Sequence, residues 1–89
     1  MTLERFQKLL GARLADLRKA EELSQEEASR RAGLTRQHLQ RIEGGTMNPT
    51  VATLFRLAKV YKVSIGDLMT SVGQVAAGTR AARPAAEGR

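Results

Sequence analysis

The chain has 89 residues, which is room for one small domain, and it carries a formal net charge of +6. It contains no cysteine and no tryptophan, so disulfide bonds, zinc–thiolate sites and cysteine nucleophiles are excluded, and aliphatic side chains must build the core. It has no long apolar run and no signal-peptide pattern at its N-terminus, so we expect a cytoplasmic protein without a membrane-spanning segment.

The positive charge is concentrated in the middle of the chain. Residues 1–23 hold five cations and four carboxylates, whereas residues 28–66 hold seven cations and the single carboxylate Glu43. Such a block attracts polyanions such as nucleic acids. A merely soluble surface is the alternative interpretation of charge alone.

The first two helices are predicted by periodicity and by capping residues. Apolar side chains recur at three- and four-residue steps over residues 3–17, the spacing of an amphipathic helix. This helix is expected to end near Glu22–Leu23, because Ser24 is a good N-cap residue. Ser24 and Glu27 have the spacing of a capping box, which predicts that a second helix starts there.

Glycines and threonines delimit the next two helices. Gly33 can adopt the left-handed conformation that ends a helix, so the second helix should stop there. Thr35 then caps a third helix that runs to about Glu43 and closes at Gly44–Gly45, and Thr50 caps a fourth. The fourth helix is predicted to have a broad apolar face made of Val51, Leu54, Phe55, Leu57, Ala58 and Tyr61.

The end of the chain changes in composition. Ser64 caps a short fifth helix, and from Thr70 onward the residues are mainly alanine, glycine and arginine. These features predict an all-α protein with three parts. Residues 1–9 extend the first helix, residues 10–69 form a compact five-helix domain, and residues 70–89 form a flexible basic tail.

The connection between the second and third helices is the most informative feature. The sequence AGLT, residues 32–35, joins the two helices by a very short connection. Gly33 is expected to form a tight turn, and the Leu34 side chain is expected to pack beneath this turn. Ser29 and Ala32 are small enough for two helices to cross closely. Steeply crossed helices joined in this way are typical of the DNA-binding helix-turn-helix.

The third helix divides into two faces. On one face, within about 140° at 100° per residue, lie four long polar side chains: Arg36, Gln37, Gln40 and Arg41. Leu39 and Ile42 point the other way with Leu34. Arginine matches the edge of guanine and glutamine the edge of adenine, so the polar face is suited to reading bases in the major groove.

The sequence resembles a known family, the lambda-repressor-like Cro/repressor helix-turn-helix domain, also called the XRE family. The matching stretches are LGARLADLRKAEELSQEE, AGLTRQHLQRIEGG and NPTVATLFRLAKVYKVSIGDLM. The sequence departs from the family at Ala28, where a larger apolar residue is usual, and at Ser29, where alanine is usual. The Ser29 hydroxyl is then expected to bond a backbone carbonyl.

The resemblance implies roles for individual residues. It assigns base reading to the polar face of the third helix and backbone contacts to Gln25, Thr35, Thr46 and Asn48. It also implies an ion pair between Arg18 and Glu43 that ties the first helix to the third. We expect this pair to be exposed and to contribute little to stability. His38 borders the polar face and could contact a phosphate or only water; without further ligands nearby, no metal is expected there.

The expected function is sequence-specific binding of double-stranded DNA by a transcriptional regulator. It is expected to act as a repressor and to bind a palindromic operator as a homodimer. Without a glycine-rich phosphate loop or an acid pair in a cleft, no enzyme activity and no cofactor are expected. Alternatives are the antitoxin of a toxin–antitoxin pair, with a toxin as protein partner, a restriction–modification controller, and a nonspecific DNA binder. Two surfaces are candidates for the dimer contact: the fifth helix, with Ile65, Leu68 and Met69, and the N-terminal extension, with Leu3, Phe6 and Leu10.

Overall fold

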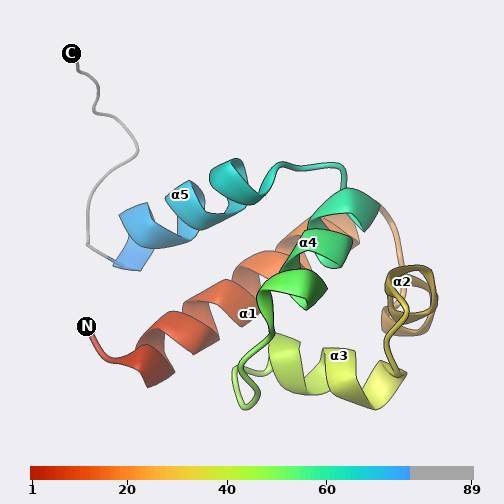
Figure 1. Ribbon diagram of the computed structural model, residues 1–89, viewed down its shortest axis with the longest axis horizontal. Helices are drawn as coiled ribbons and strands as arrows, with labels where there is room; N and C mark the ends of the chain where they lie inside the picture. The colour runs from red at the N-terminus through yellow and green to blue at the C-terminus, as the bar shows by residue number, and fades with distance from the viewer. Residues whose placement is uncertain (77–89) are drawn as a thin grey trace.

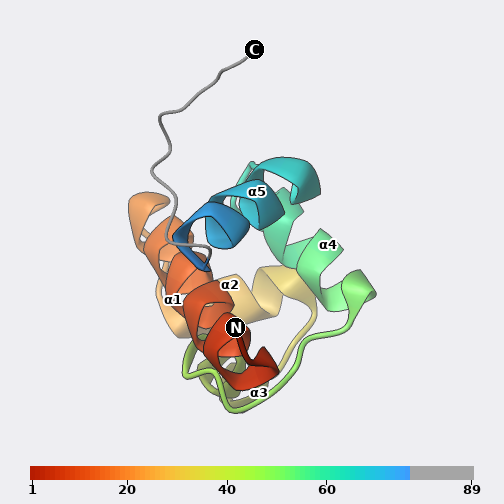
Figure 2. The same cartoon turned by 90° about the vertical axis from the view of Figure 1, so that its left-hand side faces the viewer.

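A computed structural model describes residues 1–76, and over that range the chain forms five α-helices and no β-strand. The helices are α1 (Leu3–Ala20), α2 (Gln25–Ala32), α3 (Arg36–Glu43), α4 (Val51–Val60) and α5 (Ile65–Ala76). The all-α prediction is therefore confirmed. In Figures 1 and 2, α1 runs through the molecule, α4 and α5 cover two of its sides, and α3 lies along one edge.

Every helix begins at a hydroxyl side chain. In each case the hydroxyl oxygen accepts a hydrogen bond of 2.9–3.1 Å from the backbone N–H three residues later, which satisfies one of the unpaired donors of the first turn. The five capping residues are Thr2, Ser24, Thr35, Thr50 and Ser64. Sequence reasoning identified the last four and missed Thr2. The Glu27 carboxylate does not complete the expected capping box, because it accepts hydrogen bonds from Arg30 and Arg31 instead.

The first four helices end in the same kind of turn. A residue in the left-handed conformation follows each helix. The backbone N–H of the residue after it donates a hydrogen bond to the carbonyl oxygen of the residue five positions earlier in the chain. The left-handed residues are Glu22, Gly33, Gly45 and Lys62. The first helix ends at Ala20, slightly before the predicted end near Glu22–Leu23: with φ at 59°, Glu22 lies outside the helix, and Leu23 N–H donates to the Arg18 carbonyl at 3.2 Å.

The core is formed by side chains from all five helices, and α1 packs against both α3 and α5. Its buried members are Leu10, Leu14, Ala28, Ala32, Leu39, Ile42, Leu57, Tyr61, Leu68 and Val72. Leu10 and Leu68, two of the candidates for the dimer contact, are among them. Because they lie in the core, they are not available to a second copy.

The apolar face of α4 is narrower than predicted. Val51 is 80% exposed and Phe55 is 53% exposed, whereas Leu57 is fully buried. Both exposed residues lie about 120–160° around the helix from Leu57 at 100° per residue. The side chains of α4 that pack on α2 and α5 are therefore fewer than the broad face predicted.

The fifth helix is longer than predicted. It continues to Ala76, and Val72 is buried one turn after Leu68. The predicted start of the tail at residue 70 is therefore too early, because the small residues around Val72 concealed a continuing apolar stripe. Residues 77–89, the rest of that predicted tail, lie outside the described residues. No helix within residues 1–76 has the length and apolar character needed to cross a membrane.

Candidate nucleic-acid interface

The turn between α2 and α3 has the geometry of a tight helix-turn-helix. Gly33 has φ at 73°, and the next N–H, that of Leu34, bonds the Ser29 carbonyl at 2.8 Å. Ser29 and Ala32 are buried at the crossing, and the Ser29 hydroxyl donates to the Glu26 carbonyl at 2.8 Å. The small residues and the backbone partner for Ser29 are thus as expected from the sequence.

Helix α3 presents one buried and one exposed face. Leu39 and Ile42 are buried to 1% exposure or less. The four side chains on the opposite face are exposed, and none of them makes a side-chain hydrogen bond within the described residues: Arg36, Gln37, Gln40 and Arg41. No carboxylate lies on that face, because the one acid of α3, Glu43, is turned inward. Figure 1 shows this helix along the lower edge of the molecule, where no other helix covers it from below.

A buried carboxylate holds α3 in place. The two oxygens of Glu43 accept from Arg18 Nε at 2.7 Å and from Arg18 Nη2 at 3.1 Å. Arg18 also donates to the Leu23 carbonyl at 2.8 Å, and Gln25 Nε2 donates to Glu43 at 2.8 Å. This group, which we call the Glu43 clamp (Arg18, Gln25 and Glu43), joins α1, α2 and α3.

The burial of the clamp corrects the expectation of an exposed pair. The Arg18 and Glu43 side chains are only 11% and 6% exposed, and the hydrogen bond to Glu43 raises the pKa of Arg18 above its ordinary value. Tyr61 lies nearby: burial, reinforced by the negative charge of Glu43, raises the pKa of its hydroxyl to about 12. Removal of one partner from such a buried pair leaves an uncompensated charge, so the clamp matters more to stability than a surface pair would.

The residues predicted to contact the DNA backbone have different environments. Gln25 is half-buried and engaged in the clamp, with only one of its two amide hydrogens used there. Thr35 accepts the capping bond from His38 N–H, and His38 is half-buried. Thr46 and Asn48 are exposed in the loop after α3, and the Thr46 hydroxyl donates to the Arg41 carbonyl at 3.2 Å.

Two glycines make close contacts, not predicted from the sequence, that position this loop and α3. A Cβ on Gly11 would lie within 2.6 Å of the Glu43 carbonyl oxygen and would also clash with that of Ile42, so the end of α3 can approach α1 only because residue 11 is glycine. A Cβ on Gly45 would lie 2.7 Å from Lys8 Cγ. A glycine inside a predicted helix was the available signal for the first contact, because glycine is otherwise unfavourable there.

Not all of the basic block is available to a polyanion. Glu27 lies just before the block and pairs with Arg30 and Arg31, whose hydrogen bonds lower the pKa of its carboxyl to about 2. Lys62 Nζ lies 3.7 Å from Glu21 Oε1, so this lysine also has a carboxylate partner. Of the seven cations counted in the sequence, those without a carboxylate at ion-pair distance in residues 1–76 are Arg36, Arg41, Arg56 and Lys59.

Comparison with known proteins identifies the same helix-turn-helix that the geometry shows. Residues 14–68 match the helix-turn-helix domain family HTH_3. The chain belongs to this family, the XRE-type helix-turn-helix proteins. It is 42% identical over 75 residues to the HTH-type transcriptional regulator y4dJ of Sinorhizobium fredii, a match that covers 84% of this chain and 97% of the relative.

Solved structures of the family have the same fold. The restriction-modification controller protein C.AhdI from Aeromonas hydrophila superposes with a TM-score of 0.68 at 31% identity, over 70% of this chain and 94% of that one. An HTH_3 family transcriptional regulator from Vibrio cholerae superposes with a TM-score of 0.73 at 28% identity. The match covers 83% of this chain and 42% of that one. The chain is accordingly a DNA-binding helix-turn-helix transcriptional regulator.

Proposed function

We propose that α3 enters the major groove of duplex DNA and reads its sequence through Arg36, Gln37, Gln40 and Arg41. The observation that carries the proposal is the exposed face of α3. Its four long polar side chains have no structural task in the described residues, while the opposite face is buried. Arginine and glutamine can each make paired hydrogen bonds to a base edge, so this face has the chemistry that direct readout requires.

Backbone contacts would flank the reading face on both sides. Gln25 and Thr35 begin α2 and α3, and each keeps a hydrogen that it can donate to a phosphate: the second amide hydrogen of Gln25 and the hydroxyl hydrogen of Thr35. Thr46 and Asn48 are exposed on the other flank, and His38 borders the reading face. These contacts would position α3 without themselves selecting a sequence.

The regulator is proposed to act as a homodimer on a palindromic operator, because one module of this size contacts few base pairs. The exposed apolar residues Val51 and Phe55 of α4 are the proposed contact with the second copy. Two side chains provide far less than the ~800 Å² per partner of a stable interface, so the dimer should form mainly on DNA. Phe55→Glu should then abolish cooperative binding to a palindrome, whereas Leu3→Glu, at another exposed apolar residue, should not.

Selection of bound duplexes from a random pool tests sequence-specific reading and supplies the operator. On the selected duplex, Arg36→Ala or Gln37→Ala should cost about 1–3 kcal/mol and relax the base preference. Arg31→Ala is the matched control, since Arg31 pairs with Glu27 in α2, and it should leave the preference unchanged. If the wild-type protein binds selected and random duplexes equally at physiological salt, sequence-specific reading is refuted.

Repression by occupation of a promoter is the proposed regulatory outcome, and a reporter under the selected operator would measure its sign. Control of restriction–modification genes is a second candidate, because the similar protein C.AhdI is named as such a controller. An operator found beside a restriction endonuclease gene would favour that role. A toxin that copurifies in a fixed ratio and binds the α4 surface would instead favour the antitoxin alternative.

A further inference from the structure

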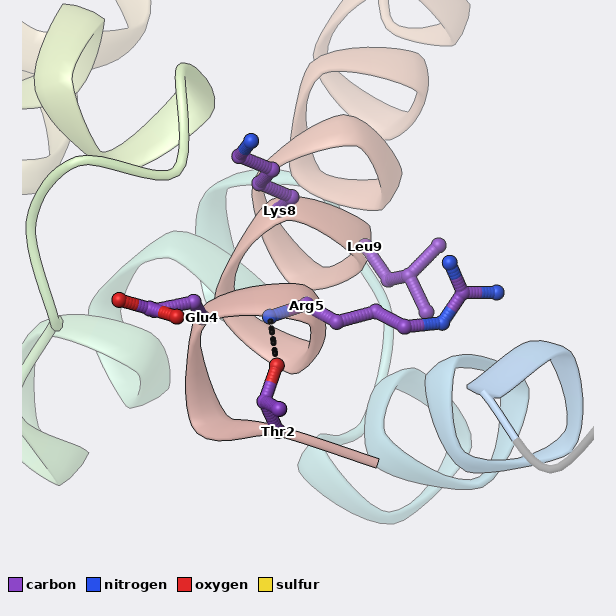
Figure 3. A pocket seen from close by; sticks show the side chains of 5 residues that line it. All are labelled: Thr2, Glu4, Arg5, Lys8 and Leu9. Atoms are coloured by element: carbon purple, nitrogen blue, oxygen red, sulfur yellow. Dashed lines mark hydrogen bonds between the residues drawn. The ribbon is translucent and has the colours of Figure 1, made fainter.

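The loop after α3 packs directly on the first turns of α1. Gly45 has φ at 76°, and a Cβ at this position would lie 2.7 Å from Lys8 Cγ and 2.8 Å from Lys8 Cα. The backbone of the loop therefore rests on the base of the Lys8 side chain. Figure 3 shows Lys8 extending from α1 beside the light green loop, while Arg5 extends to the other side, toward α5.

This loop carries no positive charge of its own. Residues 44–50 read GGTMNPT and contain neither lysine nor arginine. Lys8 is exposed and has no carboxylate at ion-pair distance in the described part of the chain. Glu4, one turn earlier on α1, extends away from the Lys8 ammonium in Figure 3. Lys8 is thus an unpaired cation beside a neutral loop.

The two segments lie at the edge of the molecule that carries α3. In Figures 1 and 2, the first turns of α1, the loop after α3 and α3 itself are all at the lower edge. A phosphate backbone flanking the groove that α3 enters would pass the exposed loop residues Thr46 and Asn48. It would then come within reach of the long Lys8 side chain, whose stem is supported by the loop.

We propose that Lys8 is a phosphate contact of the DNA complex, supplying from α1 the cation that the loop lacks. This inference rests on the proposed insertion of α3 into the major groove. It extends the binding surface to the N-terminal turns of α1. It also gives a reason for glycine at position 45, since a side chain there would push the loop away from Lys8.

The test is the salt dependence of binding by Lys8→Met, which keeps an unbranched stem against Gly45 and removes only the charge. Binding would be measured to the selected duplex and to a random duplex between 50 and 200 mM salt. One lost phosphate contact lowers the slope of log affinity against log salt by about 0.9 per bound protomer. For each bound protomer, the wild-type-to-variant affinity ratio should therefore be about 3.5-fold larger at 50 mM than at 200 mM. Lys8→Arg should restore the slope.

Arg5→Met is the matched control, because it makes the same change of charge one turn earlier on α1, where the side chain extends toward α5 rather than along the loop. It should leave the slope at the wild-type value. The proposal is overturned if Lys8→Met has the wild-type slope, or if it alters base preference rather than weakening both duplexes equally. A wild-type protein that prefers no sequence would contradict the reading role of α3, and that outcome is separate from any change of slope in Lys8→Met.

Discussion

The two helices of the helix-turn-helix each have eight residues, yet they use their charges in opposite ways. Helix α2 neutralises its own arginines, because Glu27 in its first turn accepts hydrogen bonds from Arg30 and Arg31 in its last turn. These pairs are at the surface. They follow the helical spacings of three and four residues and need no contact with another element.

Helix α3 leaves its arginines unpaired. Its carboxylate, Glu43, is buried and bonded to Arg18, so it lies away from the exposed Arg36 and Arg41. The exposed face therefore keeps a positive charge that a polyanion can neutralise. The comparison teaches that the placement of a carboxylate, rather than the number of arginines, distinguishes a helix available to bind DNA from a self-neutralised one.

The largest expected effect comes from removal of the inward carboxylate. Glu43→Ala leaves Arg18 as a buried charge without its partner, so the free energy of unfolding should fall by about 3–5 kcal/mol. Urea denaturation followed by circular dichroism would measure it. Glu27→Ala is the control in α2 and should change stability far less, because its pairs are exposed. Equal losses in the two variants would show that the Glu43 clamp is no stronger than a surface pair.

An acid on the exposed face of α3 should place a carboxylate near its arginines, as Glu27 is placed in α2. Gln37→Glu places a carboxylate in the first turn of α3, where the helix dipole tolerates it, so stability should not fall. DNA affinity should fall roughly a hundredfold or more, since facing like charges across an interface costs several kcal/mol. Gln74→Glu makes the same substitution on α5 and should bind nearly as wild type. Retained affinity in Gln37→Glu would mean that residue 37 does not face DNA.

The reverse change, removal of the carboxylate from α2, should leave the arginines of that helix unpaired, as they are in α3. Glu27→Gln releases Arg30 and Arg31 from their carboxylate. Each arginine that then engages a phosphate should steepen the salt slope by ~0.9, equally on selected and random duplexes. An unchanged slope would indicate that these two arginines point away from the DNA backbone. The measurement needs only binding isotherms at several salt concentrations.

The pH dependence of the α2 pairs gives the smallest effect. Hydrogen bonds from Arg30 and Arg31 lower the pKa of Glu27 to about 2, from an ordinary value of 4.5. A carboxyl with a lowered pKa stabilises the folded state fully above its ordinary value, and that contribution is lost as pH falls from about 4.5 to about 2. An NMR titration of the Glu27 carboxyl should show a midpoint near pH 2. A midpoint near 4.5 would show that the pairs do not persist in solution.

Local signals in the sequence were enough to predict the five helices and the starts of the last four. Ser24, Thr35, Thr50 and Ser64 cap their helices through bonds that span only three residues, so the pattern and its effect lie within one turn. The polar and apolar faces of α3 also follow from its period alone. What escaped prediction around α3 depends on contacts between elements that are distant along the chain.

Three of these contacts involve the helix-turn-helix region and its supports. The burial of the Arg18–Glu43 pair depends on how α1 and α3 pack, which charge and spacing do not reveal. The engagement of Gln25 with that pair could not be inferred from its place at the start of α2. Gly11 gave a signal, a glycine within an amphipathic helix, but the carbonyl oxygens that require it come from α3.

The Glu43 clamp has a consequence for the kinetics of recognition. Because one carboxylate joins α1, α2 and α3, the orientation of α3 is settled when the protein folds. The ordering that remains for DNA binding falls on long exposed side chains, at about 0.5–1.5 kcal/mol for each one immobilised. The encounter should then resemble the docking of a rigid body, with a rate set by electrostatic steering and therefore sensitive to ionic strength rather than to a slow rearrangement.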